Sequence, residues 1–192
     1  MANTDNAFGF RPVRKLSGAP YNGATTAYST ASGDSTAIFI GDPVILSGTS
    51  QTIEGTVYAD VDQAATGDVI VGVVTAVKAA TRDSLTYRAA STQRIVYVCT
   101  DPDMLYEIQE VAGGTALTAN DIGLNANFIV AVGSTVTGLS GVELNNSGEA
   151  TTNTLDVQII GLVDRPDNAV GDSAKWLVRI NRHQFANQVA GI

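Results

Sequence analysis

Cys99 and His183 are the residues with which this sequence could carry out nucleophilic catalysis, because the chain contains one cysteine and one histidine. A Ser-His-Asp or Cys-His arrangement uses histidine as its general base, so either would require His183. Cys99 lies in phase with Ile95 and Tyr97 at the end of an alternating segment, which predicts a buried structural thiol. His183 follows a predicted strand, and we interpret it as an ordinary surface residue.

Carboxylate pairs are the other residues that could do chemistry, here by holding a metal ion. Zinc sites use about four Cys, His or carboxylate ligands, and one Cys with one His do not supply the usual sets. Asp60 with Asp62, and Asp101 with Asp103, present alternating oxygens, but neither pair continues into the EF-hand loop pattern. We interpret these carboxylates as turn caps and predict a protein that is not an enzyme and has no metal or cofactor.

The charge balance excludes some classes of partner. The chain has 11 basic and 19 acidic residues, a net charge of -8, which argues against nucleic acid and against an anionic membrane surface. Charged residues make up only 16% of the sequence, so the polar surface must consist mainly of Ser, Thr, Asn and Gln. Burying such a surface against another protein desolvates few charges. One cysteine allows no internal disulfide, and the first six residues lack the pattern of a secretory signal.

The elements that must position these residues are predicted to be strands. Segments rich in Val, Ile, Thr and aromatic residues recur from residue 36 onward, and Gly-Asp and Asn-rich turns separate them. Trp176 alternates with Val178 and Ile180 in the last segment, which predicts a core tryptophan and antiparallel sheets with one buried face. The segments are 36–40, 44–47, 52–58, 69–78, 94–100, 104–111, 128–132, 139–144, 155–163 and 175–181.

This pattern predicts an all-β fold of about eight to ten short antiparallel strands, arranged as a jelly roll, a β-sandwich or a small barrel. One short helix is predicted over residues 117–123. Thr118 is its N-cap, Asp121 completes a capping box and Gly123 ends it.

The two ends of the chain are predicted to contact other proteins. Residues 1–35 show no sustained period and are predicted to form an extended arm, and residues 36–192 a single β domain. A flexible N-terminus is the alternative. In the arm, the predicted partner contacts are Phe8, Phe10, Arg11, Arg14 and Tyr21. At the C-terminus, the apolar residues Phe185, Val189 and Ile192 either pack back on the domain or cover a neighbouring chain.

Three stretches of the sequence stand out as motifs, and together they span most of the chain. They are residues 6–14 with 18–23, which read NAFGFRPVR and GAPYNG; residues 98–109, VCTDPDMLYEIQ; and residues 161–168 with 175–181, GLVDRPDN and KWLVRIN. None of them is a catalytic signature. They resemble the decoration (cement) proteins on the heads of tailed bacteriophages.

The resemblance implies a structural virion protein, made in the cytoplasm of the host bacterium and located on the outer capsid surface. Its partners would be the major capsid protein and further copies of itself, as a dimer or trimer, with no nucleic acid and no membrane. Known folds of such proteins include jelly rolls and small barrels. Two alternatives remain at this point: a receptor- or carbohydrate-binding β-module of a phage tail or surface adhesin, and an enzyme of an unrecognised type.

Overall fold

The computed structural model describes residues 3–187 and residue 191, and these residues form a nearly all-β protein, as predicted. The described residues contain one helical turn, the 3-10 helix η1 (Ala119–Asp121). Its capping contacts are those expected from the sequence, since the Thr118 side chain accepts from Asn120 N–H and the Asp121 carboxylate accepts from Thr118 N–H at 2.7 Å. The turn is nevertheless shorter than the helix predicted over 117–123.

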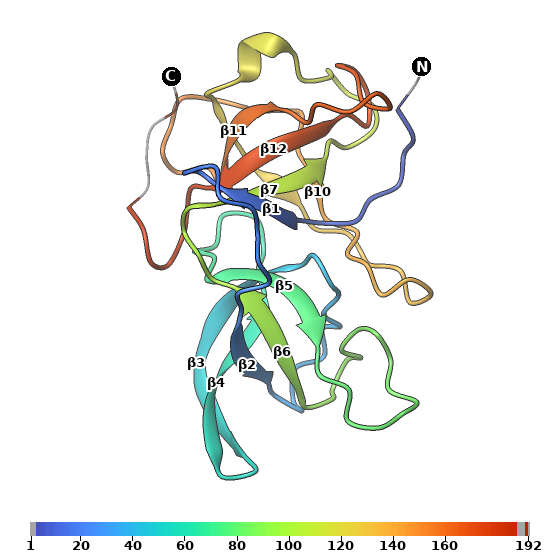
Figure 1. The fold of residues 1–192 in the computed structure, drawn as a ribbon, viewed down its shortest axis with the longest axis vertical. Coiled ribbons are helices and arrows are strands. Elements are labelled where there is room, and N and C mark those ends of the chain that lie inside the picture. Colours follow the sequence, from blue (N-terminus) through green and yellow to red (C-terminus); the bar gives the residue numbers. More distant parts are fainter. Residues whose placement is uncertain (1–2, 188–190, 192) are drawn as a thin grey trace.

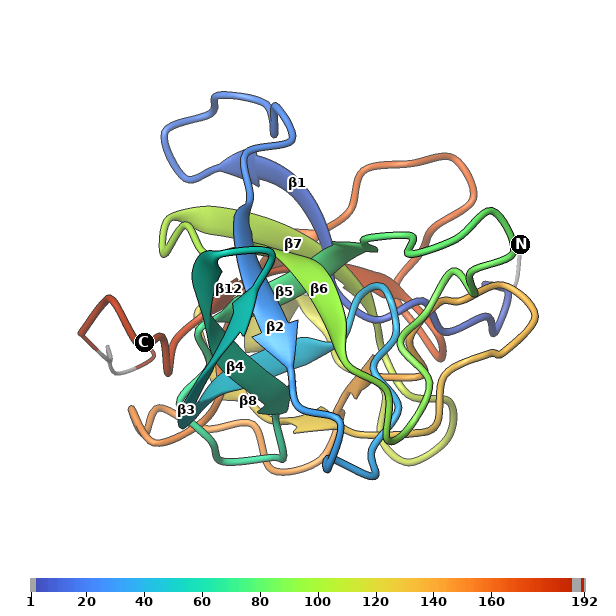
Figure 2. The ribbon, with the colours of Figure 1, turned by 90° about the horizontal axis from the view of Figure 1, so that it is seen from below.

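Five strands form a closed barrel, which occupies the lower half of Figure 1 and is seen from below in Figure 2. Neighbouring strands are antiparallel, except for β2 and β4, which run parallel. A closed barrel has no free strand edges that another chain could extend. Around the barrel the order is β2 (Thr26–Thr30), β4 (Thr56–Gln63), β3 (Pro43–Ile53), β5 (Gly72–Val77) and β6 (Arg94–Cys99).

A five-stranded antiparallel sheet forms the upper half of the molecule in Figure 1. Its order is β1 (Arg11–Lys15), β7 (Met104–Gln109), β12 (Lys175–Ile180), β11 (Val157–Leu162) and β8 (Asn125–Ala126). A separate antiparallel pair consists of β9 (Phe128–Ile129) and β10 (Glu143–Leu144). The observed architecture contains a small barrel, which is one of the predicted arrangements. A jelly roll is not confirmed.

Alternation along the strands determines what is buried. In β12, Trp176, Val178 and Ile180 are at most 1% exposed, and the residues between them are half-buried. Trp176 is therefore a core residue, as its spacing predicted. The barrel interior holds a second apolar cluster, formed by Tyr28, Ile38, Val44, Val61, Val71, Val74, Val96 and Val98.

The N-terminal residues that were predicted to form an extended arm belong to both halves of the fold. β1 pairs with β7 in the sheet, and β2 is a barrel strand. Phe10 is 2% exposed, and its ring lies edge-on to the rings of Tyr106 and Phe128, with 5.9 Å between centroids in each pair. Aromatic rings gain much free energy from burial in the core of their own chain. Residues before the predicted boundary at residue 35 are therefore part of the folded domain and do not form a separate arm.

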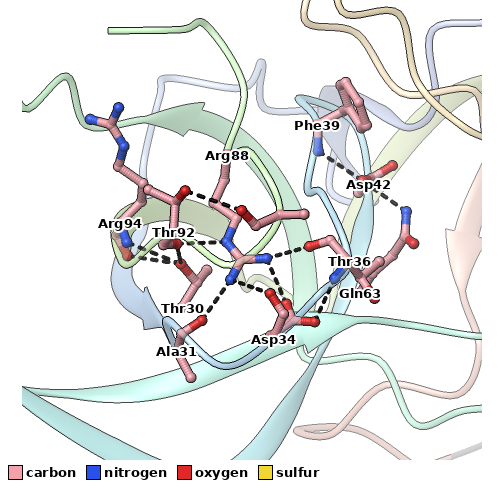
Figure 3. A network of polar contacts seen from close by, with 11 residues as sticks. Thr30, Ala31, Asp34, Thr36, Phe39, Asp42, Gln63, Arg88, Thr92 and Arg94 are labelled. Atoms are coloured by element: carbon pink, nitrogen blue, oxygen red, sulfur yellow. Dashed lines mark hydrogen bonds and ion pairs between the residues drawn. The ribbon is translucent and has the colours of Figure 1, made fainter.

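A buried arginine holds the loops of the barrel together, as Figure 3 shows. Arg88 is fully buried and forms an ion pair of 2.8 Å with Asp34. Its guanidinium also donates to the carbonyl oxygens of Ala31, Thr36 and Thr92. These contacts connect the segment after β2 to the loop between β5 and β6, so the charge is compensated by polar partners on both loops.

Candidate protein-binding surface

Cys99 and His183, the only cysteine and histidine, are both buried. Cys99 is a free thiol whose pKa is raised by burial, as expected of a structural cysteine. His183 is 3% exposed, so its interpretation as a surface residue was wrong. After β12 the chain turns back toward the barrel, where His183 bridges to Ile70 and its Nδ1 accepts from Phe185 N–H at 3.1 Å. Burial lowers the pKa of His183 to about 4, so the imidazole is neutral at physiological pH.

The acidic pairs serve the fold in different ways. Asp101 accepts from Asp103 N–H at 2.9 Å, which is the predicted turn cap, and forms an ion pair with Lys15 at 2.7 Å. Asp60 is not a turn cap, because it lies in β4 and its buried carboxylate accepts from the side chains of Ser29, Thr49 and Gln51. Within residues 3–187 and 191, no group of three or more His, Cys, Asp or Glu side chains could hold a metal ion.

The predicted arm residues gather at the junction of barrel and sheet. Phe8 is 6% exposed, and Phe10 N–H donates to the Gly41 carbonyl at 2.9 Å. Gly9 has a φ of 71°, and a Cβ there would lie 2.5 Å from Gly41 O and from Ser140 Cβ. Only glycine permits this close crossing without strain. The crossing fixes the N-terminal segment against the barrel side of the junction.

A pocket of about 220 Å³ lies beside this crossing, and we call it the junction pocket. Four of the five predicted arm contacts line it, and Arg14 does not. Arg11 is exposed at the pocket, and its Cζ lies 4.4 Å from the centroid of the Phe8 ring. The lining is mostly apolar and consists of Phe8, Phe10, Arg11, Pro12, Tyr21, Ile40, Gly41, Val74, Thr75 and Leu139.

The loop between β9 and β10, residues 130–142, was not predicted. The predicted strands 128–132 and 139–144 are too long, because β9 ends at Ile129 and β10 begins at Glu143. The loop projects from the side of the molecule near the junction in Figure 1. Val132 is 89% exposed and Val136 is 91% exposed. The signal that could have found it is the uncharged run of residues 122–142, which lies between Asp121 and Glu143. Exposed apolar side chains in an uncharged surface are typical of a protein-binding site.

Backbone hydrogen bonds fix the conformation of the β9–β10 loop although the loop is exposed. Ser134 N–H donates to Leu139 O, and Gly138 N–H donates to Ser134 O, both at 2.8 Å. Ile40 bridges to Leu139, which also lines the junction pocket. On its other side the loop borders a second pocket of about 240 Å³, lined by Thr36, Ala37, Phe39, Gln63, Val130, Ala131 and Val132. Residues of the loop therefore line both pockets, and we call the loop and the two pockets together the docking face.

The predicted C-terminal contacts are described only in part. Phe185 is 56% exposed, and its ring centroid lies 5.8 Å from that of His183. Val189 and Ile192 lie outside the described residues. Phe185 is therefore the one of the three whose position the structure gives.

Comparisons with protein-family models, with curated proteins and with solved structures found no match. No helix among the described residues is long and apolar enough to cross a membrane.

Proposed function

We propose that this is a structural virion protein that decorates and stabilises an icosahedral bacteriophage capsid. It would bind across major capsid protein subunits on the outer shell, as a dimer or trimer. The observation that carries the proposal is the docking face, on which Val132 and Val136 are about nine-tenths exposed in an uncharged loop. The resemblance of three sequence stretches to phage decoration proteins supports it independently.

A decoration protein stabilises the capsid shell by mass action. A protein that binds the assembled shell, and not its separated subunits, stabilises the shell by its binding free energy. Many copies on one shell multiply that effect, so each contact can be small. An apolar loop held by its own backbone hydrogen bonds suits this role, because little conformational entropy is lost when it binds.

The test is co-sedimentation of the purified protein with capsids of the matching phage that lack it, followed by heating. We expect saturable binding and a higher melting temperature of the loaded capsids. Absence of binding to both expanded and unexpanded capsids would reject the proposal and leave the glycan-binding alternative to be screened.

Paired variants test whether the β9–β10 loop makes the contact. Val132→Ser with Val136→Ser should weaken capsid binding at least about tenfold, because two apolar side chains no longer leave water on binding. Val57→Ser is the matched control, since Val57 is 68% exposed but lies in the barrel hairpin formed by β3 and β4. Equal loss of binding in both variants would show that the docking face is not the contact.

A further inference from the structure

We infer that the junction pocket receives one apolar side chain of the partner protein, and that Arg11 pairs with a carboxylate beside that side chain. The inference rests on the proposed function, because the partner is taken to be the capsid shell. It assigns to the docking face a ligand chemistry that neither the loop nor the resemblance supplies.

The volume of the junction pocket fits a single side chain. A dry cavity of about 150 Å³ is large enough for benzene. The junction pocket, at about 220 Å³, therefore has room for one aromatic ring or one branched aliphatic side chain. It is smaller than the roughly 300–1,000 Å³ of typical small-molecule sites, so a side chain fits it better than a free metabolite.

The positive charge of Arg11 at the junction pocket favours a carboxylate on the partner. No carboxylate of the described residues forms an ion pair with Arg11 within 4.0 Å, which is also true of other exposed cations such as Arg14. What sets Arg11 apart is that it lines the junction pocket. The Arg11 guanidinium lies over the Phe8 ring, which limits its motion and leaves its N–H groups for an outside acceptor. A planar guanidinium recognises a carboxylate through two parallel hydrogen bonds.

A second, more open pocket borders the junction pocket and gives the rest of the partner segment a place to lie. Tyr21 and Thr75 line both the pocket and a more open hollow beside it, which Tyr97 also lines. Thr75 Oγ donates to Tyr97 O at 3.1 Å, which fixes the Thr75 side chain between the two pockets. The occupant is therefore a segment of the partner with one apolar anchor and one carboxylate beside it.

Capsid binding by single variants tests the pocket once the wild-type protein is known to bind. Arg11→Ala should weaken binding about tenfold, the loss of an ion pair worth about 1.4 kcal/mol. Arg14→Ala is the matched control, because Arg14 is an exposed arginine of the same strand that does not line the pocket, and it should bind within about twofold of wild type. Thr75→Leu, which fills the pocket and keeps Arg11, should also weaken binding.

The binding of these three variants supports or overturns the inference as follows. Losses in Arg11→Ala and Thr75→Leu but not in Arg14→Ala support the inference. Equal losses in the two arginine variants would mean diffuse electrostatic attraction and would overturn it, as would wild-type binding by all three variants. Thermal melting of each variant checks that the fold is intact.

A second measurement separates failure of the pocket from failure of the proposed function. The full-length protein is titrated with millimolar N-acetyl-Phe-Asp-amide and followed by amide NMR, with N-acetyl-Phe-Asn-amide as the uncharged control. We expect saturable shifts at Phe10, Gly41 and Thr75, several-fold weaker with the Asn peptide and equally weak for both peptides in Arg11→Ala. Shifts confined to other residues, or equal wild-type affinity for the two peptides, would overturn the inference even if capsids bind. These shifts without capsid binding would keep the pocket and reject the capsid role.

Discussion

At the scale of single residues, burial sets the charge state of several groups. The Asp156 carboxylate is buried and accepts from Gly67 N–H at 3.0 Å, and burial raises its pKa to about 6. Asp42 is likewise buried, accepts from Phe39 N–H and the Gln63 side chain, and has a pKa raised to about 6 by the same cause. Both carboxylates are therefore ionised at neutral pH at some loss of stability.

Asp156→Asn should stabilise the protein at pH 8. The folded pKa of about 6 lies above the ordinary value of 3.8, so the contribution of Asp156 to stability is full below pH 3.8 and is lost as pH rises through 6. An amide does not ionise, and the variant should gain about 3 kcal/mol over wild type at pH 8. The measurement is urea unfolding at pH 8 and pH 4.

The gain should shrink toward zero at pH 4, where wild-type Asp156 is protonated in the folded state. Asp164→Asn, at an exposed position, is the control and should show neither the gain nor its pH dependence. An Asp156→Asn variant whose advantage is the same at both pH values would contradict the assignment of the shift to burial.

At the scale of elements, the loops of the barrel depend on one buried cation. The loop between β5 and β6 and the segment after β2 contact one another through Arg88. Its donors reach the Asp34 carboxylate and four carbonyl oxygens (Figure 3). No periodicity in either loop predicted this contact, because the two segments lie more than fifty residues apart in the chain.

Arg88→Met should therefore destabilise the protein by about 3–5 kcal/mol, because it leaves the Asp34 charge and buried carbonyl oxygens without their partner. Urea unfolding monitored by circular dichroism measures this loss. Arg82→Met, at an exposed position in the same loop, is the control and should change stability by about 0.5 kcal/mol or less. A loss below about 1 kcal/mol for Arg88→Met would show that the loops are held by other contacts.

At the scale of the whole molecule, the N-terminal segment connects the sheet to the barrel. The Phe10 ring packs on the sheet core, while its N–H and the neighbouring Gly9 contact Gly41 just before β3. Because one short segment contacts both halves, we expect them to unfold in a single cooperative transition.

Gly9→Ala tests the close crossing of Gly9 with Gly41. A Cβ at Gly9 meets Gly41 O and Ser140, and the residue has a positive φ, so we expect a loss of at least about 2 kcal/mol. Gly23→Ala is the control, since its φ of 82° is also positive but nothing lies within 4 Å of the added Cβ, and it should lose only about 1 kcal/mol. Trp176 fluorescence reports the sheet, and hydrogen exchange of β6 reports the barrel.

Coincident transitions in the wild-type protein would confirm the coupling, and two separate transitions would contradict it. Equal losses in the two glycine variants would show that the conformation of Gly9, and not its close crossing with Gly41, accounts for the effect.

The sequence by itself determined the all-β class, the core position of Trp176 and the buried state of Cys99. These depend on alternation along single strands, a local property that any antiparallel sheet with one buried face must satisfy. It also predicted five partner contacts near the N-terminus, because aromatic and arginine side chains outside any period are conspicuous. The structure places four of them around the junction pocket and buries Phe8 and Phe10.

Only the tertiary structure decided how those residues are used. Phe8 and His183 are buried, and Val132 and Val136 are exposed, because of pairings between distant segments. The same is true of β1 and β2, which join different sheets. A valine in an uncharged run has the same local pattern whether it lies in a strand or on a loop. Its role depends on which neighbours the fold places against it, and that information is not local to the sequence.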